Sequence, residues 1–308
     1  MSSPTEPFDP EISVVINCFN GEKYLFECLK SVQNQSFRNF EVVFIDNCSF
    51  DKTAKIYNKF TSDIRFKYFR TKKKISLASA RNFALKKIEG EFIAFLDSDD
   101  TWDRNKLKIQ VNDFKDSKVG ISASNYLLIN ERKDFQITKK DCLKEFDDKD
   151  QINSLLLNYD IHISTLMFRK KILESMTYFF DKRFNIIEDF DFVLRLSRSA
   201  RIKINKNFLA TYRWHSNNLG LRTNFKVGEE FFLWKNQPNI KENFSELNNY
   251  KFFLQRSMWL YAIYLVLSDK KRRIRLILNY LNFSKKLKLL ILLFIPKVIL
   301  KFYLKNKI

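Results

Sequence analysis

Four short apolar runs separated by helical patterns constrain the fold of this chain more than any other feature. The runs cover residues 11–18, 40–45, 66–69 and 92–96. They are rich in β-branched and aromatic residues, which is typical of strands buried on both faces of a sheet. Between them, apolar residues recur three and four positions apart, the spacing of one helix face. This alternation predicts an α/β fold, with a mostly parallel, Rossmann-like sheet flanked by helices.

The pattern continues more irregularly after residue 100, so the elements expected there are listed together. We predict helices near residues 107–114, 152–157, 187–196, 252–267, 274–281 and 287–295, strands over 120–129, 163–168, 202–205 and 208–212, and a charged surface loop over 130–150.

Polar or charged residues directly follow each of the four runs. They are Cys18, Phe19 and Asn20 after the first, Asp46 after the second, Arg70 after the third, and Asp97, Ser98 and Asp99 after the fourth. Parallel α/β sheets bind ligands beyond the carboxyl ends of their strands. We therefore expect these groups to converge where a nucleotide would lie.

Three carboxylates stand almost together after the fourth run, at Asp97, Asp99 and Asp100. Like charges this close raise one another's pKa unless a positive group lies among them. Oxygen ligands at this spacing suit a hard divalent cation, Mg²⁺ or Mn²⁺. A helix cap by Asp99 or Asp100 is the alternative interpretation, but it does not account for Asp97. The spacing favours a cation site that binds a phosphorylated substrate.

A second acidic group, Glu188, Asp189 and Asp191, stands at the head of an apolar helical pattern. Acids are favoured there by the helix dipole, which is the structural alternative to a catalytic role. The chain has two histidines, His162 and His215. A lone histidine is more often structural than a ligand, and we assign His162 no functional role.

Composition excludes several other classes of site. With 5 glycines in 308 residues, the chain lacks the glycine-rich loops of dinucleotide-binding and P-loop proteins. The 4 cysteines show no Cys-x-x-Cys spacing, so a structural zinc site is not expected and we interpret them as reduced thiols. Residues 1–10 lack the apolar segment of a secretory signal.

The positive charge of the chain is concentrated near its C-terminus. The formal net charge is +20, and residues 270–308 contain twelve Lys and Arg and no acid. The apolar run at 287–295 is about half the ~20 residues that a membrane-spanning helix needs. We predict amphipathic helices that lie on an anionic membrane surface. A helical cap packed on the catalytic domain is the alternative.

Several ordered motifs between residues 11 and 220 resemble the family 2 glycosyltransferases, bacterial enzymes of the GT-A fold that build polysaccharide, lipopolysaccharide and glycoproteins. The matching segments are residues 14–20, residues 41–49, Ala80 to Asn82, the Asp-x-Asp signature at Asp97 to Asp99, the pair Glu188 and Asp189, and Tyr212 to His215. Relatives often have Asp-Asp-Gly-Ser where this chain has Asp46 to Ser49, and a glycine where it has Ser76.

The resemblance implies a role for each matched residue. It places Cys18, Phe19, Asn20, Asp46, Arg81, Asp97 and Ser98 around the nucleotide, with Asp46 on uracil. It makes Asp99, Asp97 and His215 the ligands of Mn²⁺ or Mg²⁺, and it makes Asp189 the catalytic base, with Glu188 second and Asp191 third. Direct attack by an acceptor hydroxyl would invert the anomeric centre.

The resemblance also implies an organisation for the whole chain. Residues 1–222 would form the catalytic domain and residues 223–308 a basic helical region that associates with membrane. The donor would be a nucleotide-diphosphate sugar, UDP-linked in the family pattern, and the acceptor a saccharide or lipid-linked saccharide. The protein would work in cell-surface polysaccharide synthesis, in the cytoplasm at the inner face of the membrane. The oligomeric state is not predicted.

Two other classes of protein share some of these features. A nucleotidyltransferase that makes sugar nucleotides would share the sheet and the cation, but residues 17–21 lack its glycine-rich loop. A non-enzymatic basic protein that binds membrane or nucleic acid would explain the charge. Nucleic acid is not an expected partner, because the carboxylates would repel phosphates without a cation.

Overall fold

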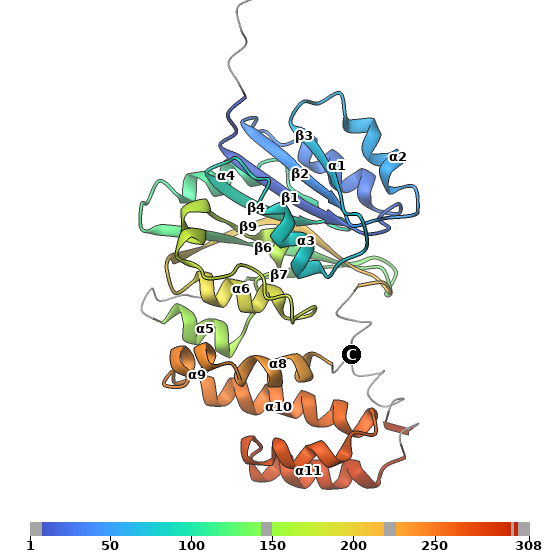
Figure 1. The fold of residues 1–308 in the computed structure, drawn as a ribbon, viewed down its shortest axis with the longest axis vertical. Coiled ribbons are helices and arrows are strands. Elements are labelled where there is room, and N and C mark those ends of the chain that lie inside the picture. The colour runs from blue at the N-terminus through green and yellow to red at the C-terminus, as the bar shows by residue number, and fades with distance from the viewer. Residues whose placement is uncertain (1–7, 143–149, 219–225, 297–298, 301–308) are drawn as a thin grey trace, which may run out of the picture. The chain divides into compact units, whose positions relative to one another are not determined.

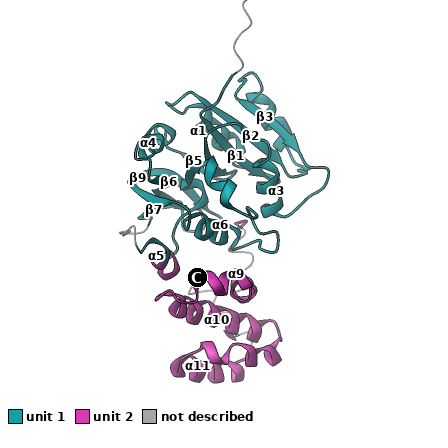
Figure 2. Ribbon diagram, turned by 60° about the vertical axis from the view of Figure 1, so that its left-hand side comes forward, with its two compact units in different colours: residues 1–152, 159–216 teal, residues 153–158, 217–308 magenta. Residues whose placement is uncertain are grey.

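The structure is a computed structural model that describes residues 8–142, 150–218, 226–296 and 299–300. The chain forms two compact units, shown in different colours in Figure 2. Unit 1 comprises residues 1–152 and 159–216, and unit 2 comprises residues 153–158 and 217–308. The predicted boundary between residues 222 and 223 lies outside the described residues.

Unit 1 is built on one sheet with the strand order β3-β2-β1-β4-β8-β6-β9-β5, and β7 pairs with β6 (Figure 1). The strands are β1 (Ile12–Cys18), β2 (Phe40–Asp46), β3 (Phe66–Arg70), β4 (Phe92–Asp97), β5 (Thr101–Trp102), β6 (Val119–Asn130), β7 (Gln136–Lys140), β8 (Met167–Arg169) and β9 (Arg201–Trp214). The mixed α/β architecture with a mostly parallel sheet confirms the predicted fold class.

Helices connect and cover these strands in unit 1. They are α1 (Leu25–Gln33), α2 (Thr53–Tyr57), α3 (Leu77–Ala84), α4 (Lys106–Asp113), α6 (Glu188–Leu196) and the 3-10 segments η1 (Asn58–Phe60), η2 (Ile163–Thr165) and η3 (Lys170–Ser175). Helix α5 (Gln151–Leu157) is divided between the units. Helix α1 buries Leu25, Cys28, Leu29 and Val32, the face that its apolar spacing predicts.

Parallel pairing aligns the carboxyl ends of the first four strands. Cys18 lies opposite Asp46 between β1 and β2, and Asp46 lies opposite Arg70 between β2 and β3. Asn17 of β1 lies opposite Asp97 of β4. The polar groups that follow these strands therefore meet at one edge of the sheet, as the sequence predicts.

Four local predictions were wrong. Residues 130–150 are not simply a loop, because β7 pairs with β6 through the hairpin that follows Asn130. The two short strands expected at 202–205 and 208–212 form the single strand β9, whose register against β6 shifts near Asn125. Residues 163–165 are 3-10 helix, and the segment 271–280 forms two 3-10 turns in place of an α-helix. In each case tertiary pairing or packing outweighs local periodicity.

Unit 2 is helical. Its elements are α8 (Val227–Lys235), α9 (Pro238–Phe244), α10 (Tyr250–Leu267), η4 (Lys271–Leu276), η5 (Leu278–Tyr280) and α11 (Phe283–Phe294). Helices α8 and α10 approach so closely at Gly228 that a Cβ atom there would lie 2.2 Å from the backbone nitrogen of Tyr261. Among the described residues, none of the helices has both the length and the apolar character needed to cross a bilayer.

Candidate active site

The loops that follow β1 and β2 are bonded to each other. The backbone N–H of Asn20 donates to Ser49 Oγ at 2.9 Å, and the N–H of Phe50 donates to Asn20 Oδ1 at 3.1 Å. Asn20 and Cys48 have φ angles of 54° and 61°. Asparagine tolerates this left-handed region, whereas Cys48 occupies a conformation that glycine adopts without strain. This explains physically why a glycine suits that position in the resembled motif.

Asp46 is fully buried at the end of β2 and accepts three hydrogen bonds. Its Oδ2 accepts from Tyr68 Oη at 2.5 Å and from Arg70 Nη1 at 2.7 Å, and its Oδ1 accepts from the Ser49 N–H at 2.8 Å. The carboxylate thus fixes the loop after β2 and the end of β3. Because the Asp46 side chain is 0% exposed and that of Arg70 is 44% exposed, a nucleobase at this edge would meet Arg70, which Asp46 holds in place.

The residues after β1 differ in accessibility. Cys18 is buried, and burial raises the pKa of its thiol to about 12, so the thiol is neutral and unreactive. The ring of Phe19 is partly exposed, and the ammonium group of Lys74 lies 3.7 Å from its centroid. The exposed ring of Phe50 packs edge-on against Phe19. Of these side chains, the two rings can contact a planar ligand.

A buried arginine separates the two acidic groups. Arg81 of α3 donates from Nη2 to Asp97 Oδ1 at 3.0 Å and from Nη1 to Glu188 Oε1 at 2.8 Å. Its guanidinium is the positive group that the carboxylate cluster requires. The end of β4 and the start of α6 are therefore joined through one side chain. The sequence places these residues close together only through the resemblance.

Asp99 pairs with His215, as the resemblance implies. His215 Nε2 lies 3.0 Å from Asp99 Oδ2, although the residues are far apart in the sequence. The imidazole ring stacks on Tyr24, with 4.7 Å between ring centroids. The Tyr24 hydroxyl in turn donates to Glu131 Oε2 at 2.6 Å. The histidine is thus held by Asp99 and Tyr24, and Glu131 holds Tyr24 in turn.

Asp100 is buried beneath this pair. It accepts from Ser164 Oγ at 2.6 Å and from the Arg213 N–H at 3.0 Å. Burial, together with the charges of Asp99 and Asp97, raises its pKa well above the usual value. A helix cap is the wrong interpretation of Asp100, because β5 follows it and α4 begins only at Lys106. Asp100 instead joins the β4 end to β9.

His162 is the residue that sequence reasoning left without a role. Asp97, Asp100 and His162 offer ligand atoms that all lie within 4.8 Å of one another. The Nδ1 atom of His162 lies 3.6 Å from Asp100 Oδ2 and also accepts the Ser164 N–H at 3.3 Å. Burial lowers the pKa of this imidazole. No local motif marks His162, because the 3-10 turn after it brings it to the cluster.

Two sets of residues could therefore hold a divalent cation. The predicted set, Asp97, Asp99 and His215, offers carboxylates whose side chains are 35% and 28% exposed. In the other set, Asp100 is 0% exposed and both of its oxygens accept protein hydrogen bonds. A hydrated cation that also contacts phosphate needs accessible oxygen ligands. The predicted set is thus the more accessible to such an ion, whereas the ligand atoms that converge within 4.8 Å among the described residues are those of Asp97, Asp100 and His162.

The three acids of α6 have different surroundings. Glu188 is buried, and burial raises its pKa to about 8 although Arg81 opposes the shift. The Asp189 side chain is partly exposed. Desolvation by the surrounding protein raises its pKa to about 6, although the positive charge of Arg81 opposes this shift. Asp191 is fully buried in an ion pair with Arg195 at 2.7 Å. Asp189 combines access with ionisation near neutral pH, as a general base requires.

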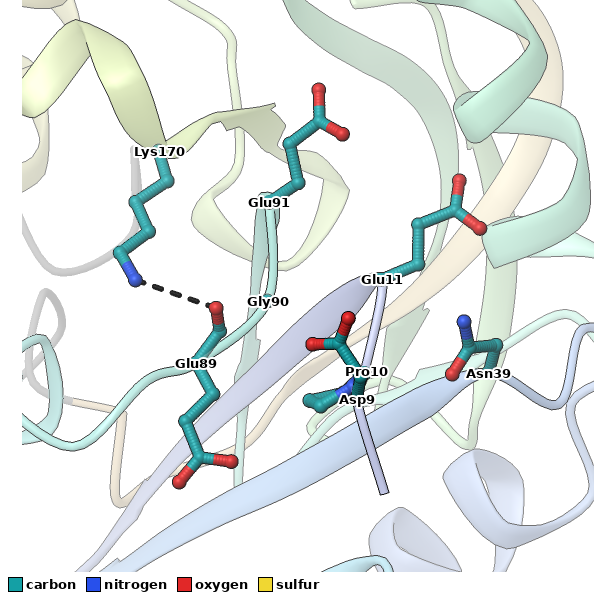
Figure 3. A pocket seen from close by; sticks show the side chains of 8 residues that line it. All are labelled: Asp9, Pro10, Glu11, Asn39, Glu89, Gly90, Glu91 and Lys170. Atoms are coloured by element: carbon teal, nitrogen blue, oxygen red, sulfur yellow. Dashed lines mark hydrogen bonds between the residues drawn. The ribbon is translucent and has the colours of Figure 1, made fainter. Parts of the chain in front are cut away.

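A separate hollow of about 390 Å³ lies at the opposite ends of the strands (Figure 3). It is lined by Asp9, Pro10, Glu11, Asn39, Glu89, Gly90, Glu91 and Lys170. These residues precede β1, β2 and β4 or follow β8. None of the predicted site residues lines this hollow.

Comparison with known proteins agrees with the motifs. The profile described as "Glycosyl transferase family 2" matches residues 13–177. An uncharacterized glycosyltransferase of Rickettsia conorii is 38% identical over 124 residues, which are 40% of this chain and 20% of that protein. The chain is thus matched to only a fifth of that relative's length.

A second relative is matched over more of its length. The Escherichia coli protein named UDP-Glc:alpha-D-GlcNAc-diphosphoundecaprenol beta-1,3-glucosyltransferase WfaP is 31% identical over 204 residues, 65% of this chain and 76% of that protein.

Two solved structures share the fold. Residues 1–349 of Staphylococcus aureus TarS, in complex with UDP-GlcNAc, give a TM-score of 0.64 at 20% identity, covering 88% of this chain and 89% of that one. The mannosyltransferase PcManGT of Pyrobaculum calidifontis, in complex with GDP-Man and Mn2+, gives a TM-score of 0.57 at 16% identity, covering 96% and 89%. Both show that the sheet has the GT-A arrangement.

Proposed function

Because the chain belongs to glycosyl transferase family 2, we propose that it transfers a sugar from a nucleotide-diphosphate sugar to a hydroxyl group of a saccharide or lipid-linked saccharide. One observation carries the proposal. The guanidinium of Arg81 bonds both Asp97 and Glu188. It thus joins the acidic group that includes the Asp99–His215 pair to the acidic group that includes Asp189. An electrophile bound between the two acidic groups would have a leaving-group site on one side and a base on the other.

We propose Mn²⁺ or Mg²⁺ as the cofactor, held by Asp99, Asp97 and His215. The ion would neutralise the charge that develops on the diphosphate as it leaves. Asp99 and His215 already face each other at 3.0 Å, and Tyr24 fixes the ring. Arg81 adds a permanent positive charge behind Asp97.

Asp189 is the proposed base, which takes the proton from the acceptor hydroxyl as that hydroxyl attacks and inverts the anomeric centre. Glu188 is second, because it is buried against Arg81 and its pKa of about 8 keeps it mostly protonated at neutral pH. Asp191 is third, since Arg195 already neutralises it. The family motif and the accessibility of Asp189 support this order.

The donor is proposed to be UDP-linked. WfaP is named for UDP-glucose and TarS was solved with UDP-GlcNAc. Phe19 and Asn20 would contact the nucleoside, Arg70 the edge of the base, and Ser98 the diphosphate side. Asp46 would act by holding Arg70. Cys18 would contribute through its backbone, because its thiol is buried.

The proposed setting is cell-surface polysaccharide synthesis in the cytoplasm, at the inner face of the membrane. WfaP is named for an acceptor attached to diphosphoundecaprenol, and another relative, TuaG, for teichuronic acid biosynthesis. We propose residues 1–222 as the catalytic domain and residues 223–308 as the region that associates peripherally with the membrane. The concentration of basic residues at 270–308 supports this division.

The test is a donor screen on the full chain. UDP-, GDP- and dTDP-sugars are offered with and without Mn²⁺, and hydrolysis and thermal shift are measured. We expect a Mn²⁺-dependent response to a UDP-sugar that Asp99→Ala abolishes. A response to none of the sugars in the presence of Mn²⁺ would refute the donor assignment, and pyrophosphate release from UTP and a sugar phosphate would favour a nucleotidyltransferase.

A further inference from the structure

Helix α11 of unit 2 has apolar side chains on two faces, and the protein covers one of them. Leu289 is buried, and Leu292 and Leu293 are partly buried against the same cluster. That cluster includes Met258, Tyr261, Ala262 and Leu265 of α10. This face of α11 therefore belongs to the core of unit 2.

The other face of α11 is exposed. Its side chains are between 51% and 87% exposed, and they are Phe283, Leu287, Leu290, Ile291 and Phe294. At 3.6 residues per turn, these five positions fall within an arc of about 100°. Single exposed apolar residues are normal on protein surfaces. Five on one arc of a short helix form a continuous stripe, which we call the α11 stripe.

Basic residues border the α11 stripe. On the helical projection Lys286 falls beside one edge and Lys288 beyond the other, and both side chains are exposed. Lys285 lies on the covered side, where its ammonium donates to the Gln255 carbonyl at 3.0 Å. No acid occurs anywhere in residues 270–308, which carry twelve basic residues. Residues 270–308 therefore offer no acidic side chain that could pair with a basic partner.

We propose that α11 binds the surface of an anionic lipid bilayer, with the α11 stripe in the boundary between headgroups and acyl chains. Its lysines would lie at the level of the lipid phosphates. An amphipathic helix lying in this way buries its apolar face about 5–10 Å deep and gains from each nearby cation. A protein groove could also cover apolar residues, but the one-signed charge favours an anionic surface. The inference deepens the proposed function, because a lipid-linked acceptor is reached at such a surface.

The two faces of α11 correspond to the two interpretations of the C-terminal apolar run. The run at 287–295, apolar except for Lys288, could lie on a membrane or form a cap packed on protein. In the structure, neighbouring residues of one helix divide between these two uses: Leu289 is buried in unit 2 and Leu290 is exposed. The helix is thus anchored to the protein by one face while it offers the other.

The first test measures co-sedimentation of the full chain with vesicles. One set contains phosphatidylcholine alone and the other contains phosphatidylcholine with 30% phosphatidylglycerol, a composition we choose for the test. We expect binding to the anionic set. The double variant Phe283→Ser and Phe294→Ser should lose at least about tenfold in vesicle affinity, because each ring contributes that much or more when buried. The matched control is Ile64→Ser, a solitary residue of unit 1 that is 79% exposed, and it should bind like the parent.

The second test varies charge without changing the α11 stripe. Lys286→Gln with Lys288→Gln should weaken binding to the anionic vesicles by about tenfold or more at low salt, at ~1 kcal/mol for each lysine near the surface. Binding to pure phosphatidylcholine should change little. Unchanged binding by both double variants would overturn the proposal. Sedimentation of the parent as a dimer that the Phe283 and Phe294 changes dissociate, without vesicle binding, would assign the α11 stripe to a second copy.

Donor hydrolysis in detergent-free solution separates this proposal from the proposed function. Both double variants should hydrolyse the donor at the parental rate, since α11 lies outside unit 1. Loss of vesicle binding with intact hydrolysis supports the proposal. Vesicle binding without any sugar transfer would support membrane binding by the α11 stripe and refute the proposed transferase activity.

Discussion

The two halves of the sheet contribute to the candidate site in different ways. The half made of β3, β2, β1 and β4 is parallel, and its site residues stand directly at strand ends. The half made of β8, β6, β9 and β5 is mixed, because β6 pairs with β9 in parallel whereas β8 and β5 pair antiparallel. It supplies groups that hold those residues in place, such as Ser164, which bonds Asp100, and His215, which pairs with Asp99. We conclude that the parallel half presents the charges and the mixed half positions them. Substitutions in the two halves should therefore lower kcat by different factors.

The largest effect is expected outside both halves, at the start of α6. Asp189→Asn removes the proposed base and should lower kcat for transfer by up to about 10⁴-fold, the upper range for general bases. The comparison variant is Asp191→Asn, which breaks the buried ion pair with Arg195 and should mainly lower Tm. Turnover at the parental rate by a folded Asp189→Asn protein would remove Asp189 from the mechanism.

A change at the end of the parallel half should be next in size. Asp99→Ala removes a proposed cation ligand and should cost about 10³-fold in kcat, because charge on the leaving diphosphate is no longer offset. Its control is Asp116→Ala, whose carboxylate forms a surface ion pair with Arg201. The rate is measured against Mn²⁺ concentration. A variant that is restored fully by more Mn²⁺ would show that Asp99 only helps to bind the ion.

The pH dependence of kcat/KM tests whether Asp189, at the start of α6, is the base. Burial raises the pKa of Asp189 to about 6, so the carboxylate form, which can accept a proton, prevails above that pH. As pH falls below about 6, kcat/KM should fall about tenfold per unit, because the base becomes protonated. A profile that stays flat to pH 4.5 would contradict the assignment of the base.

The smallest effect is expected from the contact by which Tyr24, before α1, positions His215, which follows β9 of the mixed half. Tyr24→Phe keeps the ring on His215 but loses the hydroxyl bond to Glu131, so kcat should fall only a few-fold. Tyr24→Ala removes the stacking as well and should cost about tenfold through a misplaced His215. The Mn²⁺ concentration that gives half-maximal rate should rise in the second variant. Equal rates for both variants and the parent would show that His215 needs no such support.

Prediction from sequence succeeded best where a pattern is local. The first four strands and helix α1 follow from apolar periodicity, and their polar ends meet because parallel strands share an edge. The pairing of Asp99 with His215 was available only through the family resemblance. Ser164 was missed and His162 was assigned no role, because a hydroxyl and a lone imidazole in an unmarked segment give no periodic signal.

Arg81 is a second residue whose surroundings the sequence does not specify. Its place in a motif indicated a positive charge near the nucleotide. The structure shows a buried guanidinium shared by Asp97 and Glu188. Only the approach of α6 to the end of β4 gives Arg81 its second partner, and no spacing in the sequence specifies that approach.

The sequence by itself determined that this chain forms an α/β sheet with acids at its carboxyl edge and a strongly basic C-terminal segment. These properties depend on the order of residues along one strand or helix. Tertiary structure decided which acids are accessible and which are buried, since Asp99 and Asp100 are adjacent in the chain yet their side chains are 28% and 0% exposed. It also decided which face of α11 remains open. Burial depends on neighbours brought from distant parts of the chain, so no local pattern can specify it.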